Sequence, residues 1–354
     1  MSGHKFPYRW RIADGYPAAG IQPHGCRVFG TFICGGGSTM GYKLAGFEHL
    51  GGVEIDPKIA EIYRQNHHPK HLFIQDLRKF NEREDLPSEL YELDVLDGSP
   101  PCSTFSMAGS REKAWGKKKV FREGQAKQTL DDLVFVYCET IAKLRPRVCL
   151  LENVSGLVKG NARSYCRRIC KRLDDAGYRV QVFLLNAAIM GVPQTRQRTY
   201  FLGVRKEFDW LPKLTIDVNE PLVKFGEVID RSVQAQDLSD LAFKYWQRRK
   251  AGDTSFADVV KRDTGRTAWF NFSFAKSDAV CPTITAADNQ IVFDYPRHLT
   301  PGERLLVSSF PTDYQATAKD IPFLTGMSVA PVQMAHIADA IYNQWLKPIN
   351  ERKN

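Results

Sequence analysis

The sequence contains no apolar run of about 18 residues, so no helix that spans a membrane is expected. None of the eight cysteines forms a CxxC pair, and the closest two, Cys166 and Cys170, have no histidine nearby. We therefore predict no metal site. The segment Met1–Arg11 has four basic or histidine residues but no apolar core, which argues against a secretory signal.

The composition is that of a globular protein, with 354 residues and 43% hydrophobic residues. A chain of this length needs no disulfides to hold a core, so we expect a reducing compartment, the cytoplasm. The formal net charge of +9 favours a polyanionic partner.

The positive charge is concentrated in two segments. Residues 103–128 hold seven Lys or Arg against two acidic residues, and residues 159–179 have the same balance. A charge run is most simply a solvated helix face, but 103–128 lacks helical periodicity, contains three glycines and directly follows a candidate nucleophile.

The first two thirds of the chain alternate between strand and helix patterns. Short apolar segments predict strands, and the apolar residues of 130–144 recur at helical spacing before Pro146. Strands alternating with helices predict a doubly wound α/β sheet. The predicted strands are Val28–Phe32, Leu50–Glu54, Val95–Asp97 and Val148–Leu151, and Tyr200–Val204 is a further apolar segment.

This rhythm ends near residue 205. We predict a second, smaller and mostly β domain over 206–296, with 1–205 and 297–354 forming the main domain. In the smaller domain, alternating phenylalanines at 270, 272 and 274 predict an antiparallel strand with one solvated face. The stripe of a final helix over 331–346 predicts that the chain returns to the main domain.

A glycine-rich turn, Gly35–Gly37, follows the first predicted strand, and Glu54 ends the second. Glycines let a ligand approach the backbone, and an acid at that position can bind the two hydroxyls of a ribose. The pair indicates an adenosine-bearing cofactor, although a structural turn would look similar.

Three further groups could carry chemistry. Two prolines fix the backbone that presents Cys102 after the third strand, and Glu152 follows the apolar part of the fourth. Carboxyl ends of parallel strands meet at one edge, so we expect both side chains there. Burial would suit Glu152 to donate a proton. Arg196 and Arg198 are spaced to point the same way from a strand, as an electrophilic clamp or an ion-pair network.

In this order the motifs resemble those of the DNA cytosine-5 methyltransferases, of the bacterial restriction–modification type. The resemblance covers 28–206 and 297–346. The matching blocks are Phe32–Gly37, Glu54, Asp76, Pro101-Cys102 with Phe105-Ser106, Glu152–Val154, Gln194 with Arg196 and Arg198, Arg297 through Phe310-Pro311, and Gly326 with Ser328-Val329. Cys34 and Met327 depart from the pattern, because the family usually has glycine and asparagine at these positions.

The resemblance implies a Rossmann-like domain that binds S-adenosylmethionine and a target-recognition domain that binds double-stranded DNA. Cys102 would attack C6 of a flipped cytosine, with Glu152, Arg196 and Arg198 as the other catalytic residues. The implied cofactor residues are Phe32, Gly35, Gly36, Gly37, Glu54, Ile55, Asp76, Leu77, Pro101, Ser328 and Val329. The candidate DNA contacts are Ser103, Arg111, Lys117, Lys118, Lys119, Arg248, Arg249, Arg262 and Arg266.

We further hypothesise that 103–128 closes over flipped DNA, and we expect a monomer, associated with the prokaryotic or phage-infected nucleoid, with a cognate restriction endonuclease as a partner. Three alternatives remain open at this point. A tRNA cytosine-5 methyltransferase would use the same core. A catalytically silent DNA-binding homologue would explain Cys34 and Met327. A Rossmann oxidoreductase fits the glycine turn and Glu54, but leaves Cys102 and the Gln194–Arg198 block unexplained.

Overall fold

The computed structural model describes residues 4–101, 133–158, 163–267 and 272–352. The chain divides into two compact units. The larger comprises Tyr16–Leu185, Gln197–Asp217 and Met334–Asn354, and the smaller Met1–Gly15, Asn186–Arg196 and Val218–Gln333. Cys102, Ser103, Arg111, Lys117, Lys118 and Lys119, with the rest of the predicted closing segment, lie outside the described residues.

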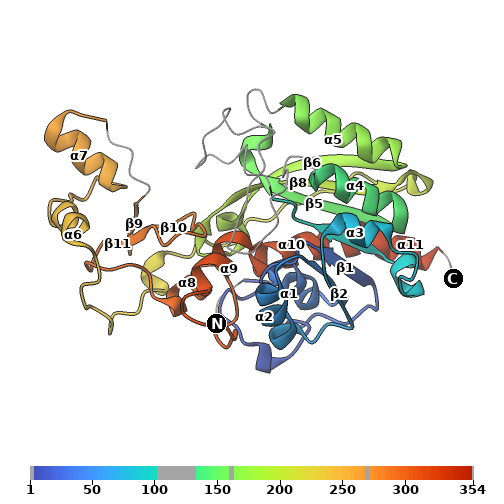
Figure 1. Ribbon diagram of the computed structural model, residues 1–354, viewed down its shortest axis with the longest axis horizontal. Helices are drawn as coiled ribbons and strands as arrows, with labels where there is room; N and C mark the ends of the chain where they lie inside the picture. Colours follow the sequence, from blue (N-terminus) through green and yellow to red (C-terminus); the bar gives the residue numbers. More distant parts are fainter. Residues whose placement is uncertain (1–3, 102–132, 159–162, 268–271, 353–354) are drawn as a thin grey trace. The chain divides into compact units, whose positions relative to one another are not determined.

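The larger unit is built on a seven-stranded sheet of order β3-β2-β1-β4-β5-β8-β6 (Figure 1). The pairings that join β3 to β5 are parallel, whereas β8 runs antiparallel to β5. The strands are β1 (Arg27–Thr31), β2 (Glu48–Glu54), β3 (His71–Ile74), β4 (Val95–Gly98), β5 (Val148–Val154), β6 (Tyr178–Asn186) and β8 (Gln197–Arg205). The four predicted strands are confirmed: three match β1, β2 and β4 within two residues at each end, and the fourth starts with β5 but ends three residues before it. The apolar segment Tyr200–Val204 lies within β8.

Helices cover both faces of this sheet because successive side chains of a strand point to opposite faces. On β2, Leu50 belongs to a core cluster with residues of α3 (Leu77–Glu82), α4 (Leu133–Leu144) and α5 (Arg163–Asp175). The preceding residue, His49, instead contacts Thr39 of α1 (Gly37–Leu44), which also bonds Tyr63 of α2 (Pro57–His67). The predicted doubly wound α/β architecture is therefore confirmed.

The chain returns to the larger unit at its C-terminal end, as predicted. Helix α10 (Pro331–Ile341) continues through a π-helical turn, Tyr342–Leu346, into α11 (Lys347–Glu351). The predicted stripe is buried throughout, with Met334, Ile337, Ile341 and Trp345 all at 0% exposure. None of the described helices is long and apolar enough to cross a membrane.

The smaller unit contains more helix than the mostly β domain that the sequence predicted. Its elements are α6 (Asp240–Gln247), α7 (Phe256–Thr264), α8 (Pro301–Val307), α9 (Ile321–Met327), β7 (Gln194–Thr195), β9 (Ser273–Ala275), β10 (Cys281–Pro282) and β11 (Gln290–Val292). The prediction of an antiparallel strand near Phe274 is wrong for the ladder itself, because β9 pairs with β11 in parallel. The helices could have been found from their caps: Ser255 and Asp258 form a capping box, and Gly265 ends α7 in left-handed backbone.

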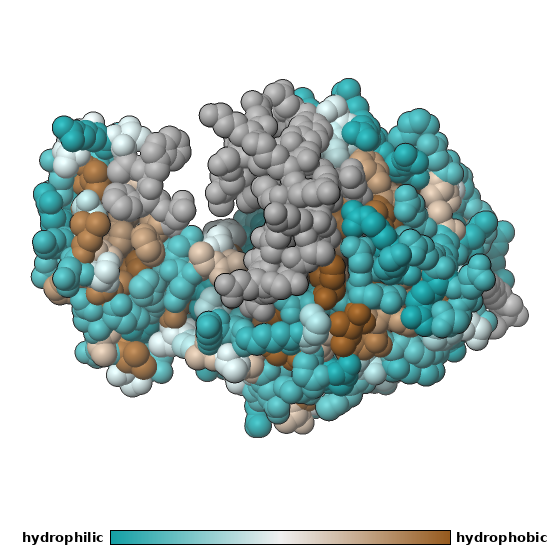
Figure 2. All heavy atoms as spheres, in the orientation of Figure 1, coloured by the Kyte–Doolittle hydropathy of each residue, from teal (hydrophilic) through white to brown (hydrophobic). Residues whose placement is uncertain are grey.

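The region of α6 and α7 has a thin core. No residue of α6 is buried, and Leu241 is 57% exposed. Figure 2 shows apolar side chains reaching the surface of this part of the smaller unit. Its stability rests instead on a small cluster that includes Phe256, Phe274 and Ile291.

The unit boundaries also differ from the predicted domain limits. The N-terminal residues belong to the smaller unit, where the Trp10 indole donates to the Ser309 carbonyl and the Ile12 amide donates to Asp313. The segment up to Gln333 belongs there as well. Such long-range bonds join segments that composition alone does not connect.

Candidate active site

The strand order reverses between β1 and β4, which makes their carboxyl ends the topological switch point of the sheet. Thr31 and Gly98, the last residues of these strands, are partners in the ladder. The Thr31 hydroxyl donates to the carbonyl of Asp97. The glycine turn leaves from β1, and the segment that leads to Cys102 leaves from β4. Ligands of open α/β sheets bind in the crevice at such a point.

The turn after β1 uses left-handed backbone at three residues, Phe32, Cys34 and Gly36, with φ values of 57°, 45° and 75°. At Gly36 the conformation and the space both require glycine, because an added Cβ would lie 2.2 Å from Nε2 of the buried His67. The same His67 nitrogen bonds the Gly35 carbonyl at 3.2 Å. His67 lies in the last turn of α2, and no local sequence pattern pointed to it.

Glu54 holds this turn against the end of β2. One carboxylate oxygen accepts from the backbone amide of Cys34 at 3.0 Å, and the other accepts from Ile55 and Asp56 at 2.9 and 3.0 Å. Burial raises the pKa of Glu54, and the three amides oppose that shift. A carboxylate has about four acceptor positions, so one remains for a ligand hydroxyl.

The other predicted cofactor residues of the larger unit differ in their exposure and in their partners. Phe32, Ile55 and Pro101 are half-buried at the carboxyl edge. The Asp76 carboxylate caps α3 through the amide of Arg78 and pairs with its guanidinium at 3.1 Å. The Leu77 side chain is 3% exposed within the core, so only its backbone can face a ligand.

Glu152 and Arg198 meet across the antiparallel pair β5 and β8. Arg198 Nε lies 3.1 Å from Glu152 Oε1, and the two side chains are only 16% and 11% exposed. The next residue of β5, Asn153, donates from its side chain to the Pro100 carbonyl at 3.3 Å. The acid and the guanidinium therefore lie beside the segment that Cys102 directly follows.

A second buried carboxylate, Asp97 of β4, was not singled out from the sequence. Its side chain is buried, and burial raises its pKa to about 7. The charge of Glu152 acts in the same direction, while the Ser38 and Tyr42 side chains act against it. The available signal was an acid at the end of a buried strand.

Arg196 and Arg198 lie on different elements and have different partners. Arg196 precedes β8 and is 3% exposed within the smaller unit. Its guanidinium donates to the carbonyls of Ile284, Gly326 and Ser328, at 3.3, 3.0 and 2.9 Å. The structure thus shows Arg196 as a residue that positions the Gly326–Ser328 backbone. The sequence predicted that the two arginines point the same way, but they bind different partners.

The surroundings of Arg196 include the other residues of its block. The Gln194 side chain accepts from the Ile284 amide and donates to the Val307 carbonyl. The predicted cofactor residues Ser328 and Val329 are both buried in the smaller unit, and Ser328 contributes its carbonyl to Arg196. Gln194 and Arg196 thereby connect β7, β10 and the end of α9.

Three of the four arginines predicted to read bases are bound within the smaller unit. Arg248 pairs with Asp263, and Arg262 pairs with Asp253 and Asp263. Arg249 stacks on Trp246, with its guanidinium 3.4 Å from the ring centroid, and donates to two carbonyls. Among the described residues, only Arg266 of the four has no side-chain partner.

Comparison with known proteins identifies a family for the chain. A family model described as C-5 cytosine-specific DNA methylase matches residues 27–343. Type II methyltransferase M.NgoPII of Neisseria gonorrhoeae is 32% identical over 187 residues, which cover 52% of this chain and only 49% of that protein. The chain thus matches about half the length of this relative.

Other similarities extend along most of the chain. Type II methyltransferase M.Bsp6I of a Bacillus species is 27% identical over 334 residues, covering 90% of this chain and 99% of that protein. A solved structure of an E. coli prophage protein, described as a DNA modification methyltransferase, aligns with a TM-score of 0.64 at 19% identity, over 90% of this chain and 99% of that one. At this identity the structural match shows the fold.

Proposed function

The chain belongs to the C-5 cytosine-specific DNA methylase family, and we propose that it transfers a methyl group from S-adenosylmethionine to C5 of a cytosine in duplex DNA. The observation that carries the proposal is the Glu152–Arg198 pair, 3.1 Å apart and nearly buried, beside the segment that leads to Cys102. An acid, a guanidinium and a thiol are the groups that this reaction needs.

Cys102, Glu152 and Arg198 each have a separate role in the proposed reaction. The Cys102 thiolate adds to C6, and the electron pair released toward C5 makes that carbon the nucleophile. Glu152, in its protonated form, hydrogen-bonds N3 and offsets the charge that develops on the ring. Arg198 donates to the cytosine carbonyl oxygen while it orients Glu152. Once C5 has taken the methyl group, loss of the C5 proton to a base and elimination of the Cys102 thiolate release the methylated base.

The carboxyl edge suits a cofactor of this type. Glu54 retains one acceptor position for a ribose hydroxyl, and Phe32 and Ile55 offer half-buried apolar surface on neighbouring loops. S-Adenosylmethionine supplies a methyl group activated by its sulfonium. Gly35, Gly36 and Gly37 allow its close approach, Asp76 and the Leu77 backbone receive the adenine, and Pro101 completes the proposed binding set of the larger unit.

The target base must leave the duplex to reach these residues, since the reacting atoms are inaccessible in the stack. We assign the phosphate contacts to the basic residues Arg111, Lys117, Lys118 and Lys119, and a contact with the flipped strand to Ser103. Base reading falls to the smaller unit, where Arg266 has its guanidinium available. We further propose that the enzyme acts as a monomer in the prokaryotic or phage-infected cytoplasm, alongside a cognate restriction endonuclease.

The decisive test uses S-adenosylmethionine labelled with tritium in its methyl group. Wild type and Cys102→Ala are incubated with mixed genomic DNA and, separately, with total tRNA, and the labelled base is identified. We expect 5-methylcytosine in DNA with wild type and none with Cys102→Ala. Label in tRNA alone would replace DNA as the substrate, and label retained by Cys102→Ala would remove the proposed nucleophile.

A further inference from the structure

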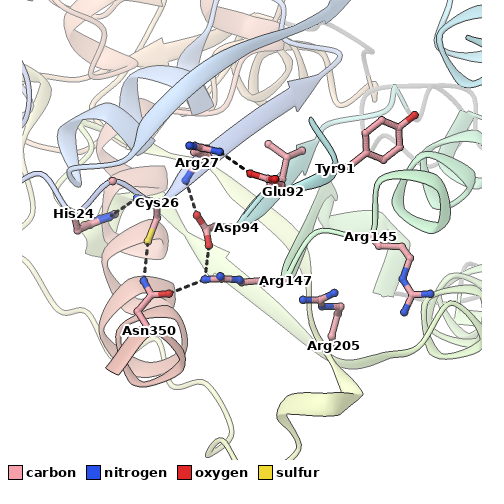
Figure 3. Close-up of a pocket in the computed structure, with 12 residues that line it drawn as sticks. His24, Cys26, Arg27, Tyr91, Glu92, Asp94, Arg145, Arg147, Arg205 and Asn350 are labelled. Atoms are coloured by element: carbon pink, nitrogen blue, oxygen red, sulfur yellow. Dashed lines mark hydrogen bonds and ion pairs between the residues drawn. The ribbon is translucent and has the colours of Figure 1, made fainter. Parts of the chain in front are cut away.

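A cavity of about 500 Å³ opens at the amino edge of the large sheet, the opposite edge from the candidate active site (Figure 3). It lies where β1, β4 and β5 begin and where the antiparallel β8 ends. Arg147 immediately precedes β5, and Glu152 lies five residues further along that strand, a distance of about 17 Å. The cavity is therefore separate from the catalytic residues, although it shares their strands.

The lining of this amino-edge cavity carries an excess of positive charge. Four arginines line it, against the two carboxylates of Glu92 and Asp94. Figure 3 shows Arg145 and Arg205 at one end and Cys26 and Asn350 at the other. Small-ligand sites usually occupy 300–1,000 Å³, so the volume suits a compact anion rather than a macromolecule.

One of the four arginines is fixed by the fold. The Arg147 guanidinium donates to Asp94 at 2.8 Å and to the Asn350 side chain at 2.6 Å. The other oxygen of Asp94 accepts from the Arg27 amide at 2.7 Å. These bonds join the starts of β1 and β5 to α11. Arg147 thus shapes the cavity wall.

Two arginines have partners that a ligand could replace. Arg27 lies 3.2 Å from Glu92 and 3.9 Å from Glu48, whose side chains are 71% and 56% exposed. Arg205 lies 2.9 Å from Glu207, whose side chain is 51% exposed. Ion pairs with exposed carboxylates contribute little because water and salt screen them. Both guanidiniums can therefore turn to an anion in the cavity.

Arg145 is the most informative residue of the lining. It is exposed, and no side-chain hydrogen bond or ion pair joins it to the described residues. Its φ of 48° is left-handed, at the position after α4 where helices usually end in glycine. Glycine suits this backbone, so a change of Arg145 to glycine removes the side chain without straining the turn.

Arg145 and Arg205 both influence the ionisation of Tyr178. The Tyr178 hydroxyl donates to the Pro146 carbonyl at 2.6 Å. Burial raises the pKa of Tyr178, while the charges of Arg205 and Arg145 oppose that shift. Both arginines also line the amino-edge cavity, and guanidinium groups that reach the same ligand suit phosphate oxygens.

We propose that the amino-edge cavity binds a small phosphate-bearing anion, held by Arg145 and Arg205 with Arg27 as a further donor. The cavity provides donors to several oxygens at once, which favours a di- or triphosphate group over a monovalent anion. Binding at this site requires neither methyl transfer nor DNA. It can therefore be measured on the whole protein independently of the proposed activity.

The test measures binding of inorganic pyrophosphate by isothermal titration calorimetry, with ionic strength held constant by chloride. We expect saturable binding by wild type and at least tenfold weaker binding by Arg145→Gly, a change that suits the left-handed backbone. Arg145→Lys should retain part of the affinity. The matched control is Arg83→Gly, which removes an arginine that follows α3, outside the cavity, and should stay within twofold of wild type.

A short duplex DNA of unrelated sequence provides the second arm. If pyrophosphate leaves the duplex bound and Arg145→Gly leaves duplex affinity unchanged, a free phosphate compound is the occupant. If pyrophosphate displaces the duplex and Arg145→Gly weakens both equally, the occupant is a DNA phosphate and the proposal is overturned. Absence of saturable pyrophosphate binding by wild type, or equal binding by Arg145→Gly, would also overturn it.

Discussion

At the carboxyl edge of the large sheet the charged side chains are already bound by other groups of the chain, whereas at the amino edge Arg145 has no side-chain partner among the described residues. Glu54 accepts three backbone amides, and Glu152 lies against Arg198. The two edges share β5 and β8 but differ in which side-chain groups are available to bind a ligand. We propose a base and a cofactor as the ligands of the first edge, and a phosphate-bearing anion as the ligand of the second.

The largest effect is expected when the acid at the carboxyl edge, Glu152, is removed. Glu152→Gln keeps the size of the side chain and an oxygen for Arg198, but loses the acidic proton. We expect methyl transfer to fall by about 10²–10⁴-fold, the usual contribution of a positioned general acid. The rate is measured under single-turnover conditions with labelled S-adenosylmethionine. Glu61→Gln on the exposed face of α2 is the control, and a near-normal rate for Glu152→Gln would refute the assignment.

A second test concerns the backbone of the same edge. Gly36→Ala places a methyl group 2.2 Å from His67 Nε2, in backbone with a φ of 75°. We expect the free energy of unfolding to fall by about 3 kcal/mol, from steric overlap and left-handed strain together. Denaturant titration measures this change. Gly252→Ala, where nothing lies within 4 Å, should change the value by less than about 0.5 kcal/mol.

The buried acid Asp97 gives the carboxyl edge a pH dependence. Its pKa of about 7 in the fold lies above the ordinary 3.8, so the folded state holds the proton more tightly and stability is lost as pH rises from about 4 to 7. Asp97→Asn removes that loss. Between pH 5 and pH 8 the unfolding free energy of the variant should rise by about 3 kcal/mol relative to that of wild type.

Chemical denaturation at both pH values measures the gain. The exposed Asp85→Asn serves as the control, since its side chain is 71% exposed and pairs only at the surface. Parallel pH profiles for wild type and Asp97→Asn would show that Asp97 ionises normally in the fold.

The smallest expected effect lies at the amino edge. Arg145→Gly relieves left-handed strain of about 1 kcal/mol, part of which is offset by the greater entropy of glycine in the unfolded chain. We expect a net gain of about 0.5 kcal/mol in unfolding free energy. Arg83→Gly, in extended backbone with a φ of −71°, should lose stability instead. A loss in both variants would show that Arg145 stabilises the fold rather than a ligand complex.

Much of the larger unit could be predicted because its signals are local. Apolar strands between helices define the sheet, and residues at strand ends such as Glu54 and Glu152 must lie near its carboxyl edge. The antiparallel direction of β8 has no such signal, because Tyr200–Val204 is apolar in either orientation. Only the ladder with β5 shows that Arg198 reaches Glu152.

The smaller unit was harder to predict because its bonds connect distant residues. Arg196 looked equivalent to Arg198 on spacing alone, yet its partners are carbonyls at 284, 326 and 328. Arg262 looked like a base reader, but Asp253 and Asp263 hold it. A positive charge in sequence says nothing about whether the fold supplies its counter-charge.

The position of β8 in the sheet also bears on how the protein is made. β5 ends at Val154, β6 follows in sequence, and β8, which begins only at Gln197, pairs with β5 in the order β5-β8-β6. At 5–20 residues per second, β5 waits roughly 2–9 s for its neighbour during synthesis. Over that interval its backbone edge is open, so the nascent chain has a defined window in which chaperone capture competes with strand insertion.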